Sequence, residues 1–417
     1  MPTPAQKSFK GLRLDIAEVQ KALSAEKLDG WLIYDFHGIN AVAAELFVFE
    51  GHMVTRRWFY LIPATGEPIL LGHKIEQANF PPLPGRAIYY AGWQELHQHL
   101  RDLLQSTGKT RPRLAMEYSP MSDVPTVSYV DAGMLELLRS LGAEVVSSAN
   151  LIQLFQARWD AGQLQSHIAA AKILHTAQQK AFKKIEAALQ AKQPVTEYDI
   201  QQFIIKEIQA GGAMIEDMPI VAVNANASNP HYAPTAQANS PIRPGDVILL
   251  DLWCKMPPTF LQEKLKGNRG AVYADITWMG YAGTKVPDNV QKVFQTVVAA
   301  RDSAVNFLRQ QAAAGQTAPG YRVDEIVRQQ ITNAGYGQYF FHRTGHSIGT
   351  TVHGNGVNID SYETRDSRHI IPGVAFSIEP GIYLPDFGVR SEIDVYFGAN
   401  GPEVHTPPQT ELVKLAV

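Results

Sequence analysis

The sequence contains almost no cysteine. Cys254 is the only one among 417 residues, which excludes an intramolecular disulfide and is typical of proteins from a reducing compartment. No apolar run approaches the length needed to cross a membrane, and residues 1–15 lack the apolar core of a signal peptide. We therefore expect a cytoplasmic protein that does not interact with a membrane.

Charge of one sign is also scarce. The 37 basic and 40 acidic residues leave a formal net charge of -3, so the chain has no general attraction for nucleic acid or anionic lipid. Hydrophobic residues make up 45% and charged residues 18%, which is the composition of a globular protein. Because 417 residues exceed one ordinary hydrophobic core, we expect two domains.

The first domain, residues 1–157, alternates helices and strands. Apolar residues at helical spacing and short apolar runs between turn residues give this pattern. It predicts helices over 15–28, 93–107 and 131–142, a hairpin over 56–73, and strands over 29–35, 87–93, 113–118 and 143–149. The expected fold class of this domain is α/β.

The second domain, residues 158–417, groups its helices and strands instead of alternating them. A long helix over 158–190 is followed by a helix that Thr196 caps. Further helices are expected over 287–312 and 322–334, with apolar strands over 246–255, 271–280, 374–384 and 388–397. This grouping predicts an α+β domain.

Each of these strands carries an isolated acid: Asp251, Asp275, Glu379 and Glu392. An ionised carboxylate in a buried strand is costly unless it is paired or bound to a metal. A single acid of this kind is most simply an ion pair or an edge position. Four in one domain indicate a shared partner instead. Because residues i and i+2 of a strand share a face, Arg390 is expected to point the same way as Glu392.

Four carboxylates and one imidazole would suit two divalent cations. Such a ligand set differs from a thiolate-type metal site. Such oxygen-rich ligands favour Mn²⁺, Co²⁺, Zn²⁺ or Fe²⁺. Two metals roughly 3.5–4 Å apart activate a shared water and stabilise the oxyanion of a hydrolytic intermediate.

Residues 342–354, HRTGHSIGTTVHG, allow two interpretations. Ser347 completes the G-x-S-x-G pattern of a serine nucleophile, which requires a helix directly after the serine. The following residues are β-branched or glycine and are poor helix formers, so His346 is favoured as a ligand. His346 and His353 differ by seven positions, and Gly349 or its neighbours must therefore redirect the chain to bring both to one side.

Together these motifs resemble the metal site of the pita-bread metallopeptidases. The resembling stretches are GDVILLDLW, ADITW, HRTGHSIGTTVH, SIEPGIY and GVRSE, and the resemblance extends from about residue 158 to the C-terminus. The preceding α/β domain is similar to the N-terminal domain of the creatinase, aminopeptidase P and prolidase branch. In that branch the N-terminal domain of one subunit often walls the active site of another, which implies a homodimer.

The resemblance implies two metal ions, with Mn²⁺ as the first choice, held by Asp251, Asp275, His346, Glu379 and Glu392. It also implies that Glu379 takes and passes on the proton of the bridging water. By the same resemblance, His353 steadies the tetrahedral intermediate at the scissile carbonyl.

The resemblance further implies that His231 faces the substrate, that His342 lines the leaving-group pocket, and that Arg390 acts behind the metal ligands. Arg365 matches the arginine with which prolidases pair the C-terminal carboxylate of the substrate. The implied activity is hydrolysis of Xaa-Pro bonds in dipeptides. The alternative interpretation is that Arg365 and Arg368 are loop residues whose side chains are solvated and do not bind the substrate.

Three departures from the family pattern concern substrate choice. Residues 256–270 expand a usually tight hairpin, Trp278 follows Asp-Ile-Thr where the family often has arginine, and the helix start at 157–167 lacks the Lys-Asp and Glu-Ile signature.

Other functions remain open: an Xaa-Pro aminopeptidase on longer peptides, a relative that hydrolyses a non-proline C–N bond, or a binding protein on this fold. Creatinases lack the full ligand set and the binding proteins have eroded ligands, so the five intact ligands argue against these two classes.

Overall fold

The structure is a computed structural model that describes residues 11–49, 51–260 and 269–417. The chain divides into two compact units, Met1–Gln156 and Ala157–Val417. Most of the expected excursion at 256–270 falls on residues 261–268, outside the described residues. Among the helices that the structure describes, none is both long and apolar enough to cross a membrane.

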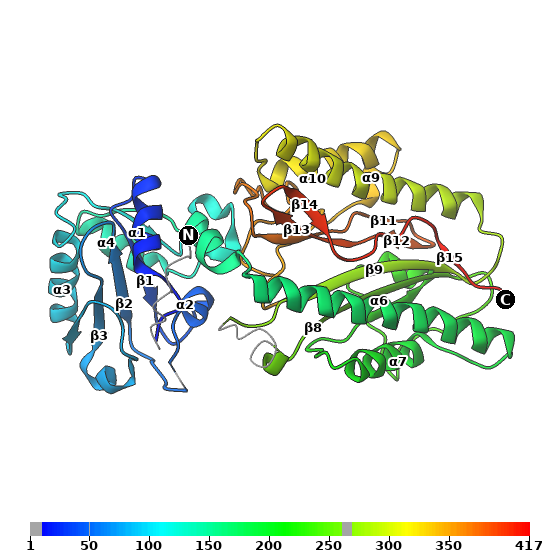
Figure 1. Cartoon of the computed structure of the whole chain (residues 1–417), viewed down its shortest axis with the longest axis horizontal. Helices are drawn as coiled ribbons and strands as arrows, with labels where there is room; N and C mark the ends of the chain where they lie inside the picture. The colour runs from blue at the N-terminus through cyan, green and yellow to red at the C-terminus, as the bar shows by residue number, and fades with distance from the viewer. Residues whose placement is uncertain (1–10, 50, 261–268) are drawn as a thin grey trace, which may run out of the picture. The chain divides into compact units, whose positions relative to one another are not determined.

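A six-stranded sheet with the order β4-β3-β2-β1-β5-β6 forms the centre of the first unit (Figure 1). Its strands are β1 Gly30–Asp35, β2 Trp58–Pro63, β3 Ile69–His73, β4 Arg86–Tyr90, β5 Arg113–Met116 and β6 Glu144–Ser147. The expected hairpin is present as antiparallel β2 and β3, joined through Gly66 at φ 102°. Strands β1, β5 and β6 are parallel, as α/β connections require.

Helices cover both faces of this sheet. They are α1 Ile16–Ala25, α2 Ala41–Leu46, α3 Trp93–Gln105, α4 Ala132–Ser140 and α5 Ala149–Ile152, with short turns η1 Lys74–Asn79, η2 Pro120–Ser122, η3 Pro125–Val127 and η4 Gln153–Ala157. One apolar core packs α1, α2 and α5 against the sheet, and the other packs α3 and α4. The six-residue α2 was not predicted because it is too short to show helical periodicity.

Two helix pairs enclose the strands of the second unit (Figure 1). The helices are α6 Ala161–Gln190, α7 Glu197–Ala210, α9 Asp288–Ala313 and α10 Gly320–Asn333, with η5 Asn224–Ser228 and η6 Gly337–Tyr339. Thr196 caps α7 as expected, in a reciprocal capping box with Asp199. Helix α6 begins three residues later than predicted because Asp160 forms its capping box with Gln163.

Three sheets make up the interior of this unit, with the orders β15-β9-β8-β7, β10-β13-β14 and β11-β12. The strands are β7 Ile220–Val223, β8 Val247–Lys255, β9 Tyr273–Tyr281, β10 Ala375–Ile378, β11 Gly381–Tyr383, β12 Gly388–Arg390, β13 Ile393–Gly398, β14 Gly401–Val404 and β15 Val413–Lys414. Helices α6 and α7 pack on one side of β7–β9 and on β15, while α9 and α10 pack against β10–β14 and the other side of β7–β9.

Two strands that were predicted to be continuous are interrupted at their acids. The first breaks into β10 and β11 at Glu379 and Pro380, since proline has no N–H for a strand ladder. The second breaks into β12 and β13 at Ser391 and Glu392. Both glutamates therefore lie at strand ends.

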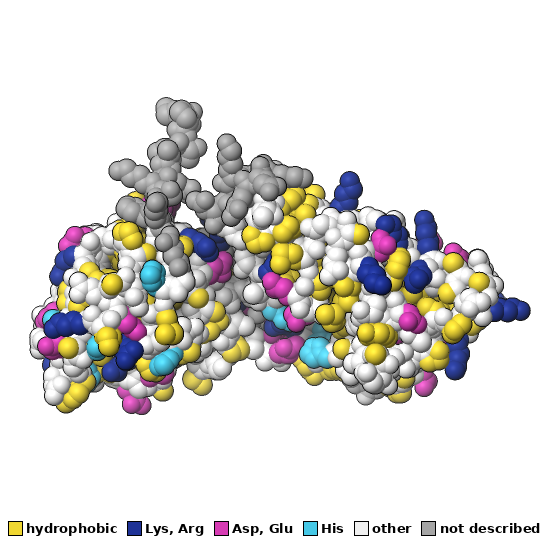
Figure 2. Space-filling view, turned by 90° about the horizontal axis from the view of Figure 1, so that it is seen from below, with side chains coloured by type: hydrophobic (Ala, Val, Ile, Leu, Met, Phe, Trp, Pro, Cys, Tyr) yellow, Lys and Arg dark blue, Asp and Glu magenta, His cyan; other side chains and the backbone are white. Residues whose placement is uncertain are grey.

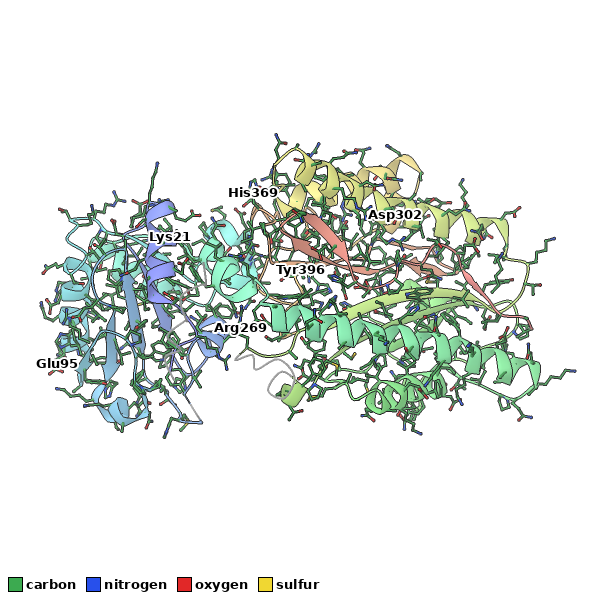
Figure 3. The ribbon with its side chains drawn as sticks, in the orientation of Figure 1. Lys21, Glu95, Arg269, Asp302, His369 and Tyr396 are labelled. Atoms are coloured by element: carbon green, nitrogen blue, oxygen red, sulfur yellow. The ribbon has the colours of Figure 1, made fainter. Side chains whose placement is uncertain are left out.

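Aromatic and charged side chains are distributed as in an ordinary globular protein. Tyr396 of β13 (Figure 3) is partly buried and stacks on Trp159, with ring centroids 5.9 Å apart. On the face shown in Figure 2, basic and acidic side chains are interspersed, as the near-neutral net charge suggests.

Candidate metal centre

The β8–β9 hairpin places both aspartates on one of its faces. Asp251 pairs with Thr277, and Trp253 pairs with Asp275. Because opposite residues and i, i+2 neighbours share a face of a sheet, the two carboxylates point the same way. Both are almost fully buried, with 7% and 4% of their surface exposed.

Backbone hydrogen bonds join β10 and Glu379 to the histidine loop, residues 342–354. The N–H of Ser377 donates to His346 O at 2.8 Å, and the N–H of Glu379 donates to Thr344 O at 2.7 Å. A Cβ at Gly345 would lie 1.9 Å from Ser377 O, so only glycine permits this approach. The close pairing brings Glu379 beside the His346 imidazole.

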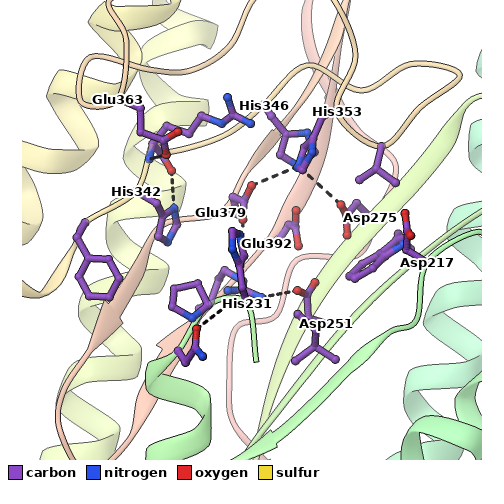
Figure 4. Close-up of a pocket in the computed structure, with 18 residues that line it drawn as sticks. Asp217, His231, Asp251, Asp275, His342, His346, His353, Glu363, Glu379 and Glu392 are labelled. Carbon is purple, nitrogen blue, oxygen red and sulfur yellow. Dashed lines mark hydrogen bonds and ion pairs between the residues drawn. The ribbon is translucent and has the colours of Figure 1, made fainter. Parts of the chain in front are cut away.

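Asp275, His346 and Glu392 present ligand atoms within 4.8 Å of one another (Figure 4). His346 Nε2 lies 3.7 Å from Asp275 Oδ2 and 3.4 Å from Glu379 Oε1. Asp275 Oδ1 is buried and has no hydrogen-bond partner among the described residues. An oxygen-rich set with one imidazole and an unpartnered buried carboxylate oxygen fits a divalent cation.

Asp251 borders the cavity that these residues line, but its two carboxylate oxygens already contact other side chains. Arg390 Nη2 forms an ion pair with Asp251 Oδ2. The Thr277 hydroxyl lies 3.0 Å from Asp251 Oδ1 and 2.8 Å from Glu392 Oε2, and it accepts a hydrogen bond from Arg390 Nε at 3.0 Å. Arg390 thus lies on the cavity side with Glu392, where strand alternation places it.

The basic side chains near the site do not balance the negative charge of its buried carboxylates. Burial, followed by the charges of Asp251 and other acids, raises the pKa of Asp275. Burial and the Asp275 charge raise the pKa of Glu392, and burial raises the pKa of Glu379 to about 7. The pKa of His346 is lowered, mainly by burial, which favours a neutral imidazole. These shifts describe a site that holds protons until a cation replaces them.

The other expected histidines border the same cavity, whose volume is about 650 Å³. A turn in which the N–H of Gly349 donates to Thr351 O redirects the loop, and the rings of His346 and His353 meet at 4.3 Å. His342 lies across the cavity from the aspartates (Figure 4), and His231 is exposed at its border.

Arg365 is absent from the cavity lining among the described residues. It is exposed, and its guanidinium lies over the Tyr321 ring at 3.7 Å. Arg368 is not solvated; it is buried and paired with Asp366. Ser347 is 2% exposed, and its Oγ accepts a hydrogen bond from the Gly356 N–H at 2.9 Å, so its hydroxyl holds the loop together.

Several cavity residues were missed in the sequence. Among them are Asp217, Trp253, Phe341, Arg343, Val352 and Glu363. Trp253 could have been found, because it stands two residues after Asp251 on the same strand face. The others lie in loops, where no periodicity reports their direction.

A buried polar pair lies behind the ligands. The N–H of Asp275 donates to Asp394 Oδ2 at 2.8 Å, and the same oxygen lies 3.9 Å from His167 Nε2. The other His167 nitrogen lies 2.9 Å from Tyr273 O. Two side chains from β13 and α6 therefore hold the backbone of the strand that carries Asp275.

Comparison with known families gives one match that covers more than half of the chain. The model of metallopeptidase family M24 matches residues 166–399. An Xaa-Pro dipeptidase from Lactobacillus delbrueckii subsp. lactis is 31% identical over 215 residues, which are 51% of this chain and 50% of that protein. The chain thus spans about half the length of the curated relatives it matches.

Solved structures resemble the whole chain. Dipeptidase PepE from Mycobacterium ulcerans has a TM-score of 0.67 at 22% identity and covers 96% of this chain and 97% of its own. A prolidase from Thermococcus sibiricus has a TM-score of 0.61 at 22% identity, with 96% and 98% covered. The expected fold class, a pita-bread domain after an α/β domain, is confirmed.

The first prediction concerns metal and pH. Since the raised pKa of Glu379 is about 7 without metal, protons compete with cations below that pH, and carboxylate repulsion destabilises the metal-free fold above it. The melting temperature gained on adding Mn²⁺ to chelator-treated protein should therefore grow between about pH 5.5 and about pH 8. Calorimetry at both pH values measures this gain. A gain that shrinks with rising pH, or that survives Asp275→Asn unchanged, contradicts the assignment.

Proposed function

This chain belongs to metallopeptidase family M24, and we propose that it hydrolyses the bond between an amino-terminal residue and a following proline, with dipeptides as its substrates. The observation that carries the proposal is the cavity in which a cation-type ligand cluster, His353 and His342 face one another. The similarity to an Xaa-Pro dipeptidase supports it.

Two divalent ions, with Mn²⁺ ahead of Co²⁺, Zn²⁺ and Fe²⁺, complete the proposed site. When bound, they polarise the scissile carbonyl and lower the pKa of water. The five proposed ligands are Asp251, Asp275, His346, Glu379 and Glu392. Arg390 pairs with Asp251 and lies 3.9 Å from Glu379 Oε2, so it orients two ligands at once.

The remaining chemistry belongs to side chains of this chain. Glu379 takes a proton from the attacking water as the water oxygen bonds to the carbonyl carbon, and it delivers that proton to the proline nitrogen as the C–N bond breaks. His353 donates a hydrogen bond to the oxyanion of the tetrahedral intermediate.

The leaving proline is proposed to sit beside His342. One nitrogen of this ring lies 2.7 Å from Arg343 O and the other 2.7 Å from the Tyr383 hydroxyl, so the ring is fixed. Phe341 supplies an apolar surface, and its ring lies 5.1 Å from that of Tyr383. A tertiary amide has no N–H, so this pocket needs apolar surface rather than an acceptor. His231 borders the mouth.

Arg365 remains our proposed partner for the substrate carboxylate. It stands two residues after Glu363, which borders the cavity. To bind a carboxylate it must leave Tyr321, and an exposed cation–π contact is worth only about 0.5–1 kcal/mol. A hydrogen bond to a charged group contributes about 1.5–3 kcal/mol, and less where the pair stays exposed to water, so the contact requires that the bound substrate shelters the pair.

An aminopeptidase that acts on longer peptides is the second candidate, because Arg365 is not at the cavity in this structure. A relative that cleaves a non-proline C–N bond is the third. Substrate length and proline dependence separate the three candidates.

Replacing Glu379 tests the proton path. Glu379→Gln keeps the side-chain volume and removes the base, so we expect a folded protein whose turnover of Ala-Pro falls by at least about 10²-fold. Steady-state kinetics at saturating Mn²⁺ and circular dichroism measure the two properties. Ser347→Ala is the control: it removes only a hydrogen bond within the loop, so its turnover should stay far above that of Glu379→Gln, although its melting temperature falls. Near-normal turnover in Glu379→Gln would exclude this path.

Peptide length tests the dipeptidase assignment. We expect Ala-Pro to be cleaved faster than Ala-Pro-Ala, and Arg365→Ala to reduce this preference mainly through KM, because it loses only a binding contact. Arg343→Ala is the matched control. If it removes the preference instead, the carboxylate contact belongs to Arg343. Equal cleavage of both peptides by the wild type would favour the aminopeptidase.

We also propose a homodimer. In the first unit, Phe36 and Ile39 are 41% and 55% exposed on either side of His37, which has φ 61°. An exposed apolar loop of this kind is a suitable contact for a second subunit. Light scattering at micromolar concentration should give twice the mass of one chain. A fully active monomer would refute the proposal.

A further inference from the structure

Trp253 borders the cavity beside two proposed metal ligands, and no role is yet assigned to it. On β8 it follows Asp251 by two positions, and across the hairpin it pairs with Asp275. All three side chains therefore share one face of the sheet. The indole forms the cavity wall directly beyond the metal centre.

The part of the indole that meets the cavity is carbon. Its Nε1 is buried and has no hydrogen-bond partner among the described residues, so the nitrogen faces the wall. The ring packs against an apolar cluster that contains Trp159, Val272 and Ile348, and Val352 packs on the same cluster and borders the cavity. This end of the cavity is an apolar wall that is supported from behind.

A network on the neighbouring strand positions holds Glu216, the residue that precedes Asp217, at the same end of the cavity. Lys255 follows Trp253 by two residues and binds Glu216 Oε1 at 2.7 Å, and the Tyr273 hydroxyl donates to Glu216 Oε2. Met214 also bridges to Lys255. Asp217, the residue after Glu216, borders the cavity on the side of Asp251 and Asp275, opposite His342 and Glu363 (Figure 4).

This end fits the amino-terminal residue of the substrate. The assignment rests on the proposed function, in which the proline occupies the opposite end beside His342. A dipeptide then places its ammonium group near the Asp217 carboxylate, which has no basic partner within 4.0 Å among the described residues. Its first side chain points at the apolar wall of Trp253 and Val352.

We propose that Trp253 is the residue that limits the size of the substrate's amino-terminal side chain, so that the enzyme selects small apolar residues before proline. A bulky aromatic wall that is packed from behind cannot move aside without losing its contacts in the cluster. Glycine and alanine fit in front of the indole. Phenylalanine and leucine collide with it.

The experiment compares kcat/KM for Gly-Pro, Ala-Pro, Leu-Pro and Phe-Pro. The wild type should favour Ala-Pro over Phe-Pro by at least about tenfold, the range that one or two methylene groups give in a pocket. Trp253→Ala should raise the Phe-Pro to Ala-Pro ratio by at least about tenfold, and Trp253→Phe should give an intermediate ratio. Melting temperatures verify that each variant is folded.

Trp278→Ala is the matched control. Trp278 pairs with Leu250 on the neighbouring strand and packs near His175, so it lies on the other face of the hairpin. It should leave the ratio unchanged. If Trp253→Ala does not fold, Trp253→Phe and Trp253→Leu test the same dependence on size.

Two failures are distinguishable. If the wild type cleaves Phe-Pro as fast as Ala-Pro, or if every folded Trp253 variant keeps the wild-type ratio, this inference is wrong while the proposed function stands. If no Xaa-Pro peptide is cleaved by the metal-loaded wild type, the proposed function itself is wrong and the inference falls with it.

Discussion

Mutual repulsion among buried carboxylates is the constraint on which the rest of the second unit depends. Asp275 and Glu392 are almost fully buried, and burial and the charges of neighbouring acids, Asp251 and Glu379 among them, raise the pKa of both. Arg390 offsets part of this charge but is committed to Asp251. Protons neutralise the remainder until a divalent cation replaces them. On the proposed assignment, stability and function share one requirement, because a bound metal would complete the fold of its own site.

The surrounding fold serves to hold these acids in place against that repulsion. The β8–β9 register aligns two aspartates, and the breaks at Glu379 and Glu392 free two glutamates from the strand ladders. Behind the proposed ligands, Asp394 and His167 form hydrogen bonds with the backbone of β9. One polar atom of each, Asp394 Oδ2 and His167 Nδ1, bonds to the strand that carries Asp275, while Asp394 Oδ1 and His167 Nε2 are buried without a hydrogen-bond partner among the described residues.

Much of this could be predicted from the sequence, for physical reasons. Isolated acids in apolar strands are rare enough to indicate a site, which predicted four of the five proposed ligands, and all five border one cavity. The direction of Arg365 could not be predicted, because it depends on a ring in a distant helix, Tyr321. The pairing of Asp394 with Asp275 joins strands far apart in the chain. Periodicity reports which face a residue occupies, but not which distant residue it meets.

Metal stoichiometry tests the central claim most directly. Elemental analysis of the protein, purified without added metal and then dialysed against Mn²⁺, should give two ions per chain. It should give fewer after Asp275→Asn, because that carboxylate has a buried oxygen with no other partner among the described residues. Wild-type protein that retains no divalent metal, or an Asp275→Asn variant that retains the full amount, would contradict the account.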